Sequence, residues 1–331
     1  MDMKETMCVT GAGGYQASWV VKLLLSHGYK VHGTVRDPCD PKNVHLEKLE
    51  KASENLQLFK ADLLDFEGLC KAIDGCTGVF HVACPLPSSS PNIQNPEVEL
   101  VKPAVEGTSN VLKACTKAKV KRVVMVSSVA AVVLNPNWPK DQVMDETCWT
   151  DKHFCMAKAN QETKVAGFNW YSLAKTEAER LALEYAEENE VEVVTVCPPL
   201  IMGPMLQPKI NSSSMLLLSI ARDGLEKMEY FDWTAVDVRD VAEALLLLYK
   251  NPEAKGRYIC SSYSASTLVL IEKLKGLYPN HNYPKQISGE GFVCNMSSEK
   301  LHKLGWKNRP LEETLVDTIE DYYEKGLLNK P

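Results

Sequence analysis

The chain of 331 residues lacks a long hydrophobic run, because its longest uninterrupted apolar stretch covers only 244–249. A bilayer-spanning helix needs about 20 apolar residues, so no transmembrane segment is expected. The N-terminus carries no apolar signal segment, and no internal repeat or low-complexity tract is present. We therefore expect a cytoplasmic globular protein without a membrane partner.

A strong charge of one sign is also missing. The sequence has 37 Lys and Arg residues against 43 Asp and Glu residues, a net charge of −6, and no basic cluster. Nucleic acid is therefore not an expected partner. The length suits one large α/β domain and a smaller second one. We expect the protein to act as a monomer on a small molecule.

The 11 cysteines include no Cys-x-x-Cys pair and no Cys/His spacing typical of zinc. This pattern favours a reducing compartment and predicts no metal site. Cys148 and Cys155 lie seven residues apart in a stretch without clear periodicity, 129–168. We expect two reduced thiols there, and a regulatory disulfide between them is the alternative.

A glycine-rich turn near the N-terminus is the most informative feature. It follows an apolar run at 7–9 and precedes an amphipathic segment and a second β-branched run that ends at Val35. This order predicts strand, turn, helix and strand. Gly11, Gly14 and Ala17 occupy the small-residue positions of a dinucleotide-binding turn, where the N-terminus of the helix can bind phosphates.

The end of that second strand indicates which dinucleotide binds. NAD-binding units commonly place an acid there, whereas this chain has Arg36, with Lys42 six residues on. A guanidinium binds a 2′-phosphate with paired donors, so NADP(H) is the expected cofactor. In the alternative interpretation, both cations are solvated surface charges, and Asp37 could be mistaken for the acid of an NAD site.

Strands and helices continue to alternate along the first two thirds of the chain, which indicates parallel strands joined by helical crossovers. The expected fold class is α/β, a Rossmann-type doubly wound parallel sheet with a smaller α/β substrate-binding lobe in the C-terminal half. We expect residues 1–198 to form the NADP-binding domain, with 234–260 returning to it. Residues 199–233 and 261–331 are expected to form the lobe. Asp240 is the predicted N-cap of a helix that runs to Tyr249.

Three residues are the candidate catalytic set. Ser128 lies at the tip of a predicted buried strand, and Tyr171 and Lys175, four residues apart, share one face of a predicted helix. A neighbouring ammonium favours the phenolate and lowers the pKa of the tyrosine, and the serine hydroxyl can bind the same carbonyl oxygen. This set suits carbonyl reduction by hydride transfer. The plainer interpretation is an ordinary amphipathic helix face. Of the two adjacent serines, Ser127 and Ser128, only one can point into the cleft.

These motifs resemble the extended short-chain dehydrogenase/reductases, within them the plant group of cinnamoyl-CoA reductases, dihydroflavonol reductases and related cinnamyl alcohol dehydrogenases. The resemblance covers nearly the whole chain and is carried by VTGAGGYQASWVVKLLL, GVFHVACP, VVMVSSVAAV, NWYSLAK and GRYIC. It implies Ser128, Tyr171 and Lys175 as the catalytic triad, and Arg36 and Lys42 on the 2′-phosphate. The full set of expected cofactor contacts is Thr10, Gly11, Gly13, Gly14, Tyr15, Gln16, Arg36, Lys42, Asp62, Leu63, Val82, Ala83, Ser127, Tyr171, Lys175, Pro198 and Leu200. Among these, a turn or capping role is an equal alternative for Asp62.

The chain departs from the group's pattern at two places. Gln16 stands where an aliphatic residue is usual, and Ser172, Leu173 and Ala174 replace the residues of the NWYCYGK motif typical of cinnamoyl-CoA reductases. The second departure disfavours a CoA thioester. The first choice is therefore NADPH-dependent reduction of a free hydroxycinnamaldehyde to its alcohol. The alternatives are reduction of cinnamoyl-CoA esters or of a flavonoid-like ketone, and, in a different class, a non-catalytic NADP(H)-sensing protein.

Aromatic and apolar residues, four of them in the second half of the chain, are the candidates for holding a flat phenylpropanoid ring. Each of them could equally belong to the core of the lobe. The expected substrate-binding residues are Pro85, Trp138, Met205, Tyr230, Phe231 and Trp233.

Overall fold

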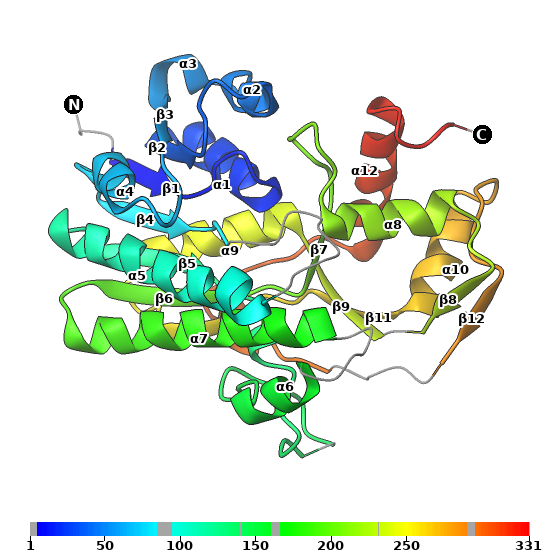
Figure 1. Ribbon diagram of the computed structural model, residues 1–331. Helices are drawn as coiled ribbons and strands as arrows, with labels where there is room; N and C mark the ends of the chain where they lie inside the picture. Colours follow the sequence, from blue (N-terminus) through cyan, green and yellow to red (C-terminus); the bar gives the residue numbers. More distant parts are fainter. Residues whose placement is uncertain are drawn as a thin grey trace.

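The computed structural model describes residues 5–84, 95–139, 141–159, 166–230, 232–289 and 295–330. Its largest element is a seven-stranded sheet in the order β10-β6-β5-β4-β1-β2-β3, in which every neighbouring pair is parallel (Figure 1). This sheet confirms the predicted α/β fold class. Its strands are β1 Thr6–Val9, β2 Lys30–Val35, β3 Leu56–Lys60, β4 Gly78–His81, β5 Arg122–Val126, β6 Glu192–Cys197 and β10 Gly256–Ile259.

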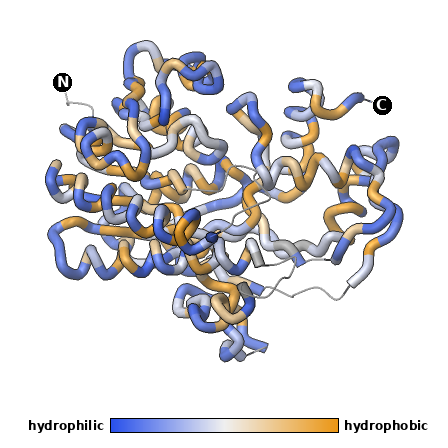
Figure 2. Tube along the Cα trace, viewed as in Figure 1, coloured by the Kyte–Doolittle hydropathy of each residue, from blue (hydrophilic) through white to orange (hydrophobic). Residues whose placement is uncertain are grey.

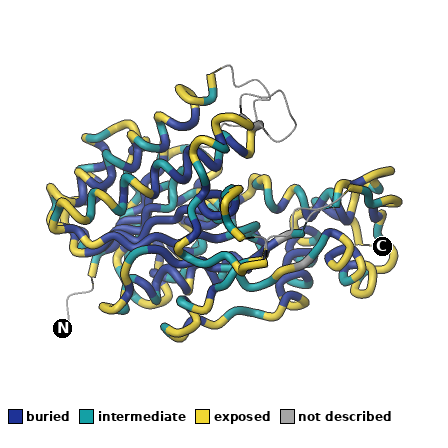
Figure 3. Tube along the Cα trace, turned by 90° about the horizontal axis from the view of Figure 1, so that it is seen from below, coloured by how far each residue is buried: buried dark blue, intermediate teal, exposed yellow. Residues whose placement is uncertain are grey.

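Helices cover both faces of this sheet. On one face, α1 (Tyr15–Ser26) and α9 (Val238–Lys250) pack with the strands in one hydrophobic cluster. On the other, α4 (Phe66–Ile73), α5 (Lys102–Lys117) and α7 (Ala166–Glu188) form a second cluster. Figure 3 shows the strands as a buried layer beneath half-exposed helices, and Figure 2 shows hydrophobic and hydrophilic segments alternating along those helices. This pattern follows from burying one stripe of each helix.

The connections contain more short elements than the sequence predicts. After β2 the chain forms a 3-10 turn (Pro41–Asn43) and two one-turn helices, α2 (Val44–Glu47) and α3 (Ala52–Asn55). A five-residue π-helical stretch (Glu97–Val101) leads into α5. The long segment after β5 holds a 3-10 turn (Val129–Ala131) and α6 (Lys152–Ala159), so it is partly helical.

A second lobe lies beside the carboxyl ends of the large sheet and contains two small sheets (Figure 1). Three helices pack around its own hydrophobic cluster. The three-stranded sheet is β11-β9-β7, and β12 pairs with β8. The elements are β7 Leu200–Met202, α8 Ser212–Arg222, β8 Lys227–Glu229, β9 Asp232–Asp237, β11 Tyr263–Ser266, α10 Thr267–Leu277, β12 Gln286–Ser288 and α12 Leu311–Glu324.

The chain crosses between the two lobes more than once. β10 and α9 belong to the large sheet and its cover, whereas 234–237 lie in β9 of the three-stranded sheet. Beyond 261, α11 (Glu299–Lys303) returns to the large domain, because Leu301 and Trp306 pack in the same cluster as α1 and α9. The division into 1–198 with 234–260, and the remainder, stays a proposal. Within the described residues, no helix is long and apolar enough to cross a membrane.

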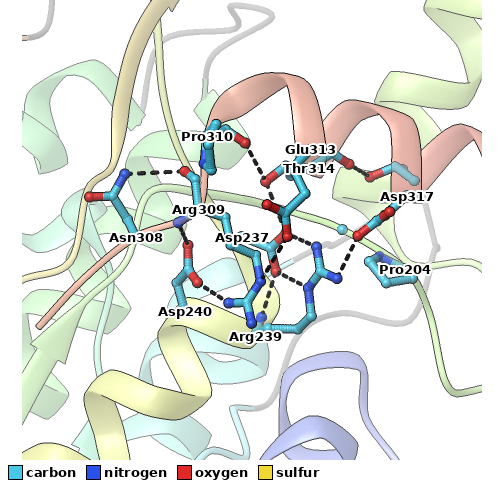
Figure 4. A network of polar contacts seen from close by, with 12 residues as sticks. Pro204, Asp237, Arg239, Asp240, Asn308, Arg309, Pro310, Glu313, Thr314 and Asp317 are labelled. Atoms are coloured by element: carbon cyan, nitrogen blue, oxygen red, sulfur yellow. Dashed lines mark hydrogen bonds and ion pairs between the residues drawn. The ribbon is translucent and has the colours of Figure 1, made fainter.

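A network of charged side chains joins α9 to α12 (Figure 4). Asp237, fully buried, accepts hydrogen bonds from Arg239 and from the Thr314 hydroxyl at 2.9 Å. Arg239 also pairs with Asp317 at 2.6 Å, and Asp240 pairs with Arg309. The N-cap of α9 is Asp237, which corrects the prediction of Asp240. Asp240 lies in the first turn of the helix, where its carboxylate pairs with Arg309, two residues before α12.

Replacing Thr314 with Val tests how much this junction contributes. The change keeps the side-chain shape and removes one donor to a buried carboxylate, which costs about 2 kcal/mol of unfolding free energy. Thr318→Val is the matched control, because the Thr318 hydroxyl bonds only the Thr314 carbonyl of its own helix, at 2.6 Å. Denaturant titration should show a clearly larger loss for Thr314→Val. Equal losses would mean that the junction bond contributes nothing specific.

Candidate active site

The glycine-rich turn lies where the order of the large sheet reverses, between β1 and β4. Gly11 has a φ of +67°, and a Cβ built there would lie 3.0 Å from the Cβ of Ala83. Only glycine fits this left-handed position against the neighbouring chain. Thr10 fixes the same neighbour, because its Oγ1 accepts hydrogen bonds from the amides of Val82 (3.1 Å) and Ala83 (3.0 Å). Ligands bind at such a switch point, outside the carboxyl ends of the strands.

A cavity of about 500 Å³ opens at this point. Eleven of the predicted cofactor residues line it, from the turn and the ends of β2, β3 and β4. They are Gly11, Gly13, Gly14, Tyr15, Gln16, Arg36, Lys42, Asp62, Leu63, Val82 and Ala83. Ala17, the third small residue of the predicted turn, also lines it. The wall further contains residues that the sequence did not single out: Thr34, Val35, Asn43, Ala61, Leu64, Cys84 and Pro103. Thr34 and Val35 directly precede Arg36 at the end of β2. Their position next to this predicted cofactor residue could have identified them from the sequence.

The polar groups of the cavity fit the diphosphate of a dinucleotide. Gly14, the N-cap of α1, makes no side-chain capping bond, so amides of the first turn remain available to an anion. The Nε2 of Gln16 is buried without a hydrogen-bond partner, and so is the Oδ1 of Asn43. A Cβ on Gly13 would lie 2.3 Å from that Asn43 oxygen, so any larger residue there would displace the Asn43 side chain. Unpaired buried polar groups cost free energy, and a bound polar ligand would satisfy them.

The two predicted 2′-phosphate residues both lie at the cavity. Arg36 is exposed just after β2, and Lys42 forms an ion pair with Asp40 at 2.5 Å. The Lys42 hydrogen bonds hold the pKa of the Asp40 carboxyl below its usual range. Such an exposed pair contributes little stability, so Lys42 can exchange this partner for a phosphate. Asp62 lines the cavity and also closes its own turn, accepting from the Leu64 amide at 3.1 Å.

Lys175 is the buried cation of the candidate catalytic set. Its side chain is 5% exposed, and Nζ donates to the carbonyl of Val126, at the tip of β5, over 3.1 Å. The same ammonium contacts Cys84 in the cavity wall, which connects the triad to the cavity. Burial alone would lower the pKa of Lys175, but Cys84 and Tyr171 raise it, so the net direction is upward. The side chain therefore remains a cation.

Tyr171 and Ser128 lie together next to this ammonium. Tyr171 is one helical turn before Lys175 on α7 and lies beside Ser128. The Oγ of Ser128 accepts from the Ala130 amide at 3.1 Å, which leaves its hydroxyl proton free to donate. Burial raises the pKa of Tyr171, and Lys175 and Ser128 offset only part of that rise. The net direction is opposite to the lowering expected from the sequence, because desolvation outweighs the ammonium.

Four other predicted cofactor residues lie outside the cavity wall. Thr10 supports the turn from below, and the Ser127 hydroxyl bonds Glu179 at 2.7 Å. The Pro198 carbonyl accepts from the Val129 amide at 3.1 Å. Leu200 pairs with Ala235 in the second sheet. Direct contact of these residues with the cofactor stays a prediction.

Three of the six predicted substrate residues have described side chains. Met205 is 2% exposed in the lobe core, and its amide bonds Asp321 at 3.1 Å. Trp138 packs near Cys148 and donates to the Gln142 carbonyl at 3.1 Å. The Tyr230 hydroxyl donates to Asp232 at 2.9 Å. Pro85 and Phe231 lie outside the described residues, as does the side chain of Trp233.

The departure from NWYCYGK lies within the packing of α7. Ser172, Leu173 and Ala174 are 0%, 4% and 1% exposed, and the Ser172 hydroxyl donates to the Phe168 carbonyl at 2.8 Å. Leu173 and Ala174 belong to the core cluster on that face of the sheet. These residues therefore contact neighbouring elements of the protein, and their identity says little about the carbonyl that enters the cleft.

The ten cysteines in the described part of the chain are free thiols. Cys148 donates to the Val132 carbonyl at 3.3 Å, and Cys155 packs in the cluster under α7. Burial raises the pKa of each to about 11, so neither is a ready thiolate. Among the residues whose placement is described, no group of His, Cys, Asp or Glu is arranged to hold a metal ion.

Comparison with known proteins identifies the class. Residues 7–260 match the model of the NAD dependent epimerase/dehydratase family, and the chain belongs to this family of extended short-chain dehydrogenase/reductases. It is 43% identical to cinnamoyl-CoA reductase 1 of Petunia hybrida over 99% of this chain and 95% of that protein. The resemblance to the plant reductase group is thereby confirmed.

Solved structures agree with this assignment. The crystal structure of vestitone reductase from alfalfa (Medicago sativa) has a TM-score of 0.82 and 32% identity, covering 98% of this chain and 100% of that one. Gre2 from Candida albicans in complex with NADPH has a TM-score of 0.81 and 26% identity, covering 97% of this chain and 99% of that one. The chain is therefore an NAD(P)-dependent oxidoreductase of this family.

His81 gives the site a pH-dependent stability. It is 2% exposed and hydrogen-bonds Thr10 and Thr108 at 3.0 and 3.3 Å. Burial, with a further effect of Lys175, lowers its pKa to about 3. The folded state resists protonation that the unfolded chain accepts below about pH 6.5, so stability present above that pH is lost as the pH falls.

Replacing His81 with Gln tests this linkage. Between pH 7 and pH 5, the wild type should lose about 2 kcal/mol of unfolding free energy through this residue. This value follows because each pH unit below about 6.5 costs about 1.36 kcal/mol. His81→Gln keeps hydrogen-bonding capacity without a titrating group, so its stability should fall less steeply over the same range. Denaturant titrations at several pH values measure both slopes. Parallel curves would contradict a buried neutral histidine.

Proposed function

We propose that this protein is an NADPH-dependent reductase of phenylpropanoid carbonyl compounds. The observation that carries the proposal is the grouping of Ser128, Tyr171 and Lys175, connected through Cys84 to a cavity suited to a dinucleotide. The phosphates would lie against the first turn of α1, and the 2′-phosphate against Arg36 and Lys42. When bound, NADPH supplies a hydride.

The three side chains divide the remaining work. Ser128, whose hydroxyl proton is free, donates a hydrogen bond to the carbonyl oxygen and polarises it. Tyr171, kept protonated by burial, gives its proton to the oxygen as negative charge develops there. Lys175 remains charged and stabilises the phenolate that is left. General acid catalysis of this kind contributes about 10²- to 10⁴-fold.

We propose a cinnamoyl-CoA type thioester as the first substrate candidate. The Petunia relative is named a cinnamoyl-CoA reductase, which favours this substrate. The departure from the NWYCYGK motif counts little against it, because Ser172 and Leu173 are buried. Hydride addition and loss of the CoA thiolate, which takes up a proton, give the aldehyde. The free hydroxycinnamaldehyde is the second candidate, because its reduction to the alcohol uses the same hydride and the proton from Tyr171.

The alternative of a non-catalytic NADP(H)-sensing protein fits the site less well. A sensor needs the dinucleotide cavity but has no use for a buried ammonium beside a phenol and a serine. Burying a cation carries a desolvation cost, and nucleotide binding alone does not require that cost here. The presence of all three side chains in contact therefore supports an enzyme.

Steady-state kinetics on feruloyl-CoA, coniferaldehyde and a flavonoid-type ketone test the proposal. With NADPH, we expect the highest kcat/KM on the thioester, and Tyr171→Phe should lower kcat by about 10²-fold or more on every active substrate. A clearly higher kcat/KM on coniferaldehyde would put the aldehyde first. If Tyr171→Phe retains wild-type turnover, the proton-transfer role is wrong.

Replacing Arg36 with Ala tests the cofactor. Loss of a bidentate phosphate partner should raise the KM for NADPH about 10- to 100-fold and leave the KM for NADH nearly unchanged. Arg222→Ala is the control, since this arginine lies on α8 and pairs with its neighbour Asp223. Equal effects of Arg36→Ala on the two cofactors would refute a 2′-phosphate contact.

A further inference from the structure

A buried ion pair lies beneath the candidate catalytic set. Glu179 is 0% and Arg257 5% exposed, and the guanidinium binds the carboxylate through Nε at 2.9 Å and Nη2 at 3.3 Å. Glu179 follows Lys175 by one turn on α7, and Arg257 lies on the edge strand β10. Burying two charges is expensive and is often no more stabilising than an apolar pair. None of the steps assigned to the triad uses either residue.

Glu179 ties α7 to the tips of two strands. Its carboxylate accepts from the hydroxyl of Ser127, directly after β5, at 2.7 Å and from that of Thr195 on β6 at 2.6 Å. The Cys197 thiol is a longer third donor at 3.5 Å. With Arg257, these donors surround both carboxylate oxygens. The Ser127 hydroxyl, next to Ser128 in the chain, therefore points at Glu179.

Arg257 holds the chain that follows Ser128. Its Nη2 donates to the Ala131 carbonyl at 3.2 Å, and Nη1 donates to the carbonyls of Cys148 (2.8 Å) and Glu146 (3.1 Å). The guanidinium also lies 3.4 Å from the ring centre of Trp149. One side chain thus fixes both the turn after β5 and the loop that leads to α6.

Ser128 lies between these anchors. The Val126 carbonyl is bound by Lys175, the Ser127 hydroxyl by Glu179, and the Ala131 carbonyl by Arg257. In the backbone, the amides of Ser127 and Val129 donate to Val196 and Pro198 at 2.7 and 3.1 Å. The direction of the Ser128 hydroxyl therefore depends on the ion pair through contacts on both sides.

We propose that Glu179 and Arg257 are positioning residues that hold Ser128 and Lys175 in register with Tyr171. Neither touches the substrate; both act through the tip of β5. The Glu179 carboxylate also contributes to raising the pKa of Lys175, which supports the same role electrostatically. The inference rests on the proposed function, because the carbonyl reduction provides its main measurement.

Two variants test the proposal on the full-length enzyme. Ser127→Ala cuts the link between Glu179 and β5, and Glu179→Gln removes the charge while keeping the shape. Small errors in orientation slow chemistry much more than binding. For both variants we expect kcat to fall about tenfold or more. The Kd for NADPH, measured by fluorescence titration, should stay unchanged within about twofold, because the Ser127 hydroxyl is bonded to Glu179 and does not line the cavity, which goes against the predicted cofactor contact of Ser127. With NADPH deuterated at the transferred hydride, the isotope effect on kcat should rise.

Glu177→Gln is the matched control, since Glu177 lies on the same helix and pairs at the surface with Lys152 at 2.8 Å. It should leave kcat and the isotope effect unchanged. If Ser127→Ala and Glu179→Gln only lower the melting temperature, and kcat per NADPH-binding site stays at the wild-type value, the pair is purely structural and the inference is overturned. Should Glu179→Gln fail to fold, Ser127→Ala decides alone, because it removes one hydroxyl.

The outcomes separate this inference from the proposed function. If the wild type reduces none of the carbonyl compounds, the proposed function fails. The inference is then decided by a pH titration of Tyr171 in the NADP⁺ complex. The tyrosinate absorbance of Tyr171 is obtained by subtracting the absorbance of the Tyr171→Phe variant. Loss of the Ser128 contact should raise its titration midpoint in Ser127→Ala. An unchanged midpoint would overturn the positioning role.

Discussion

One buried ammonium determines how the site is built. Lys175 lies almost without solvent exposure between α7 and the tip of β5, so its charge must be met by the protein. A backbone carbonyl, a thiol, a phenol and, one turn away, the Glu179 carboxylate surround it. The phenol and the carboxylate belong to α7 itself, whereas the carbonyl of Val126 and the thiol of Cys84 come from two other segments of the chain. Satisfying this cation therefore brings together the elements that carry Ser128, Tyr171 and the cavity wall, and the rest of the arrangement follows from it.

The electrostatics of the site favour the reductive direction of proton transfer. Burial raises the pKa of Tyr171 and outweighs the opposite effect of the ammonium, so the phenol is protonated at neutral pH before a carbonyl arrives. In the proposed reaction, the ammonium would stabilise the negative charge that develops on the phenol oxygen as its proton leaves, at the stage where stabilisation speeds the reaction. His81 is different. It is buried next to the turn, neutral and bonded to two threonines, and it supports the strand end on which Ala83 approaches Gly11.

The two lobes are connected through a few well-defined contacts. Tyr15 and Trp19 of α1 donate to the carbonyls of Gly203 and Pro204, each at 2.8 Å, while Asp237 and Arg239 join the start of α9 to α12. The helix whose N-terminus lines the cavity is thus bonded directly to the first turn of the second lobe. These bonds fix the orientation of the second lobe relative to the cavity.

The sequence alone determined the fold class, the turn at Gly11 and the cations at Arg36 and Lys42. It also placed Ser128 on a strand tip and Tyr171 and Lys175 on one helix face. These features depend on local periodicity and short spacings. It could not show that Asp237 caps α9, since Asp237 and Asp240 are similar local capping signals and are distinguished by Thr314 and Arg309, partners distant in the sequence. Nor could it show that Ser172 and Leu173 face the core, that desolvation dominates the pKa of Tyr171, or that Glu179 and Arg257, 78 residues apart, form one pair. Those features are decided by burial and by contacts between distant segments, which exist only once the sheet is assembled.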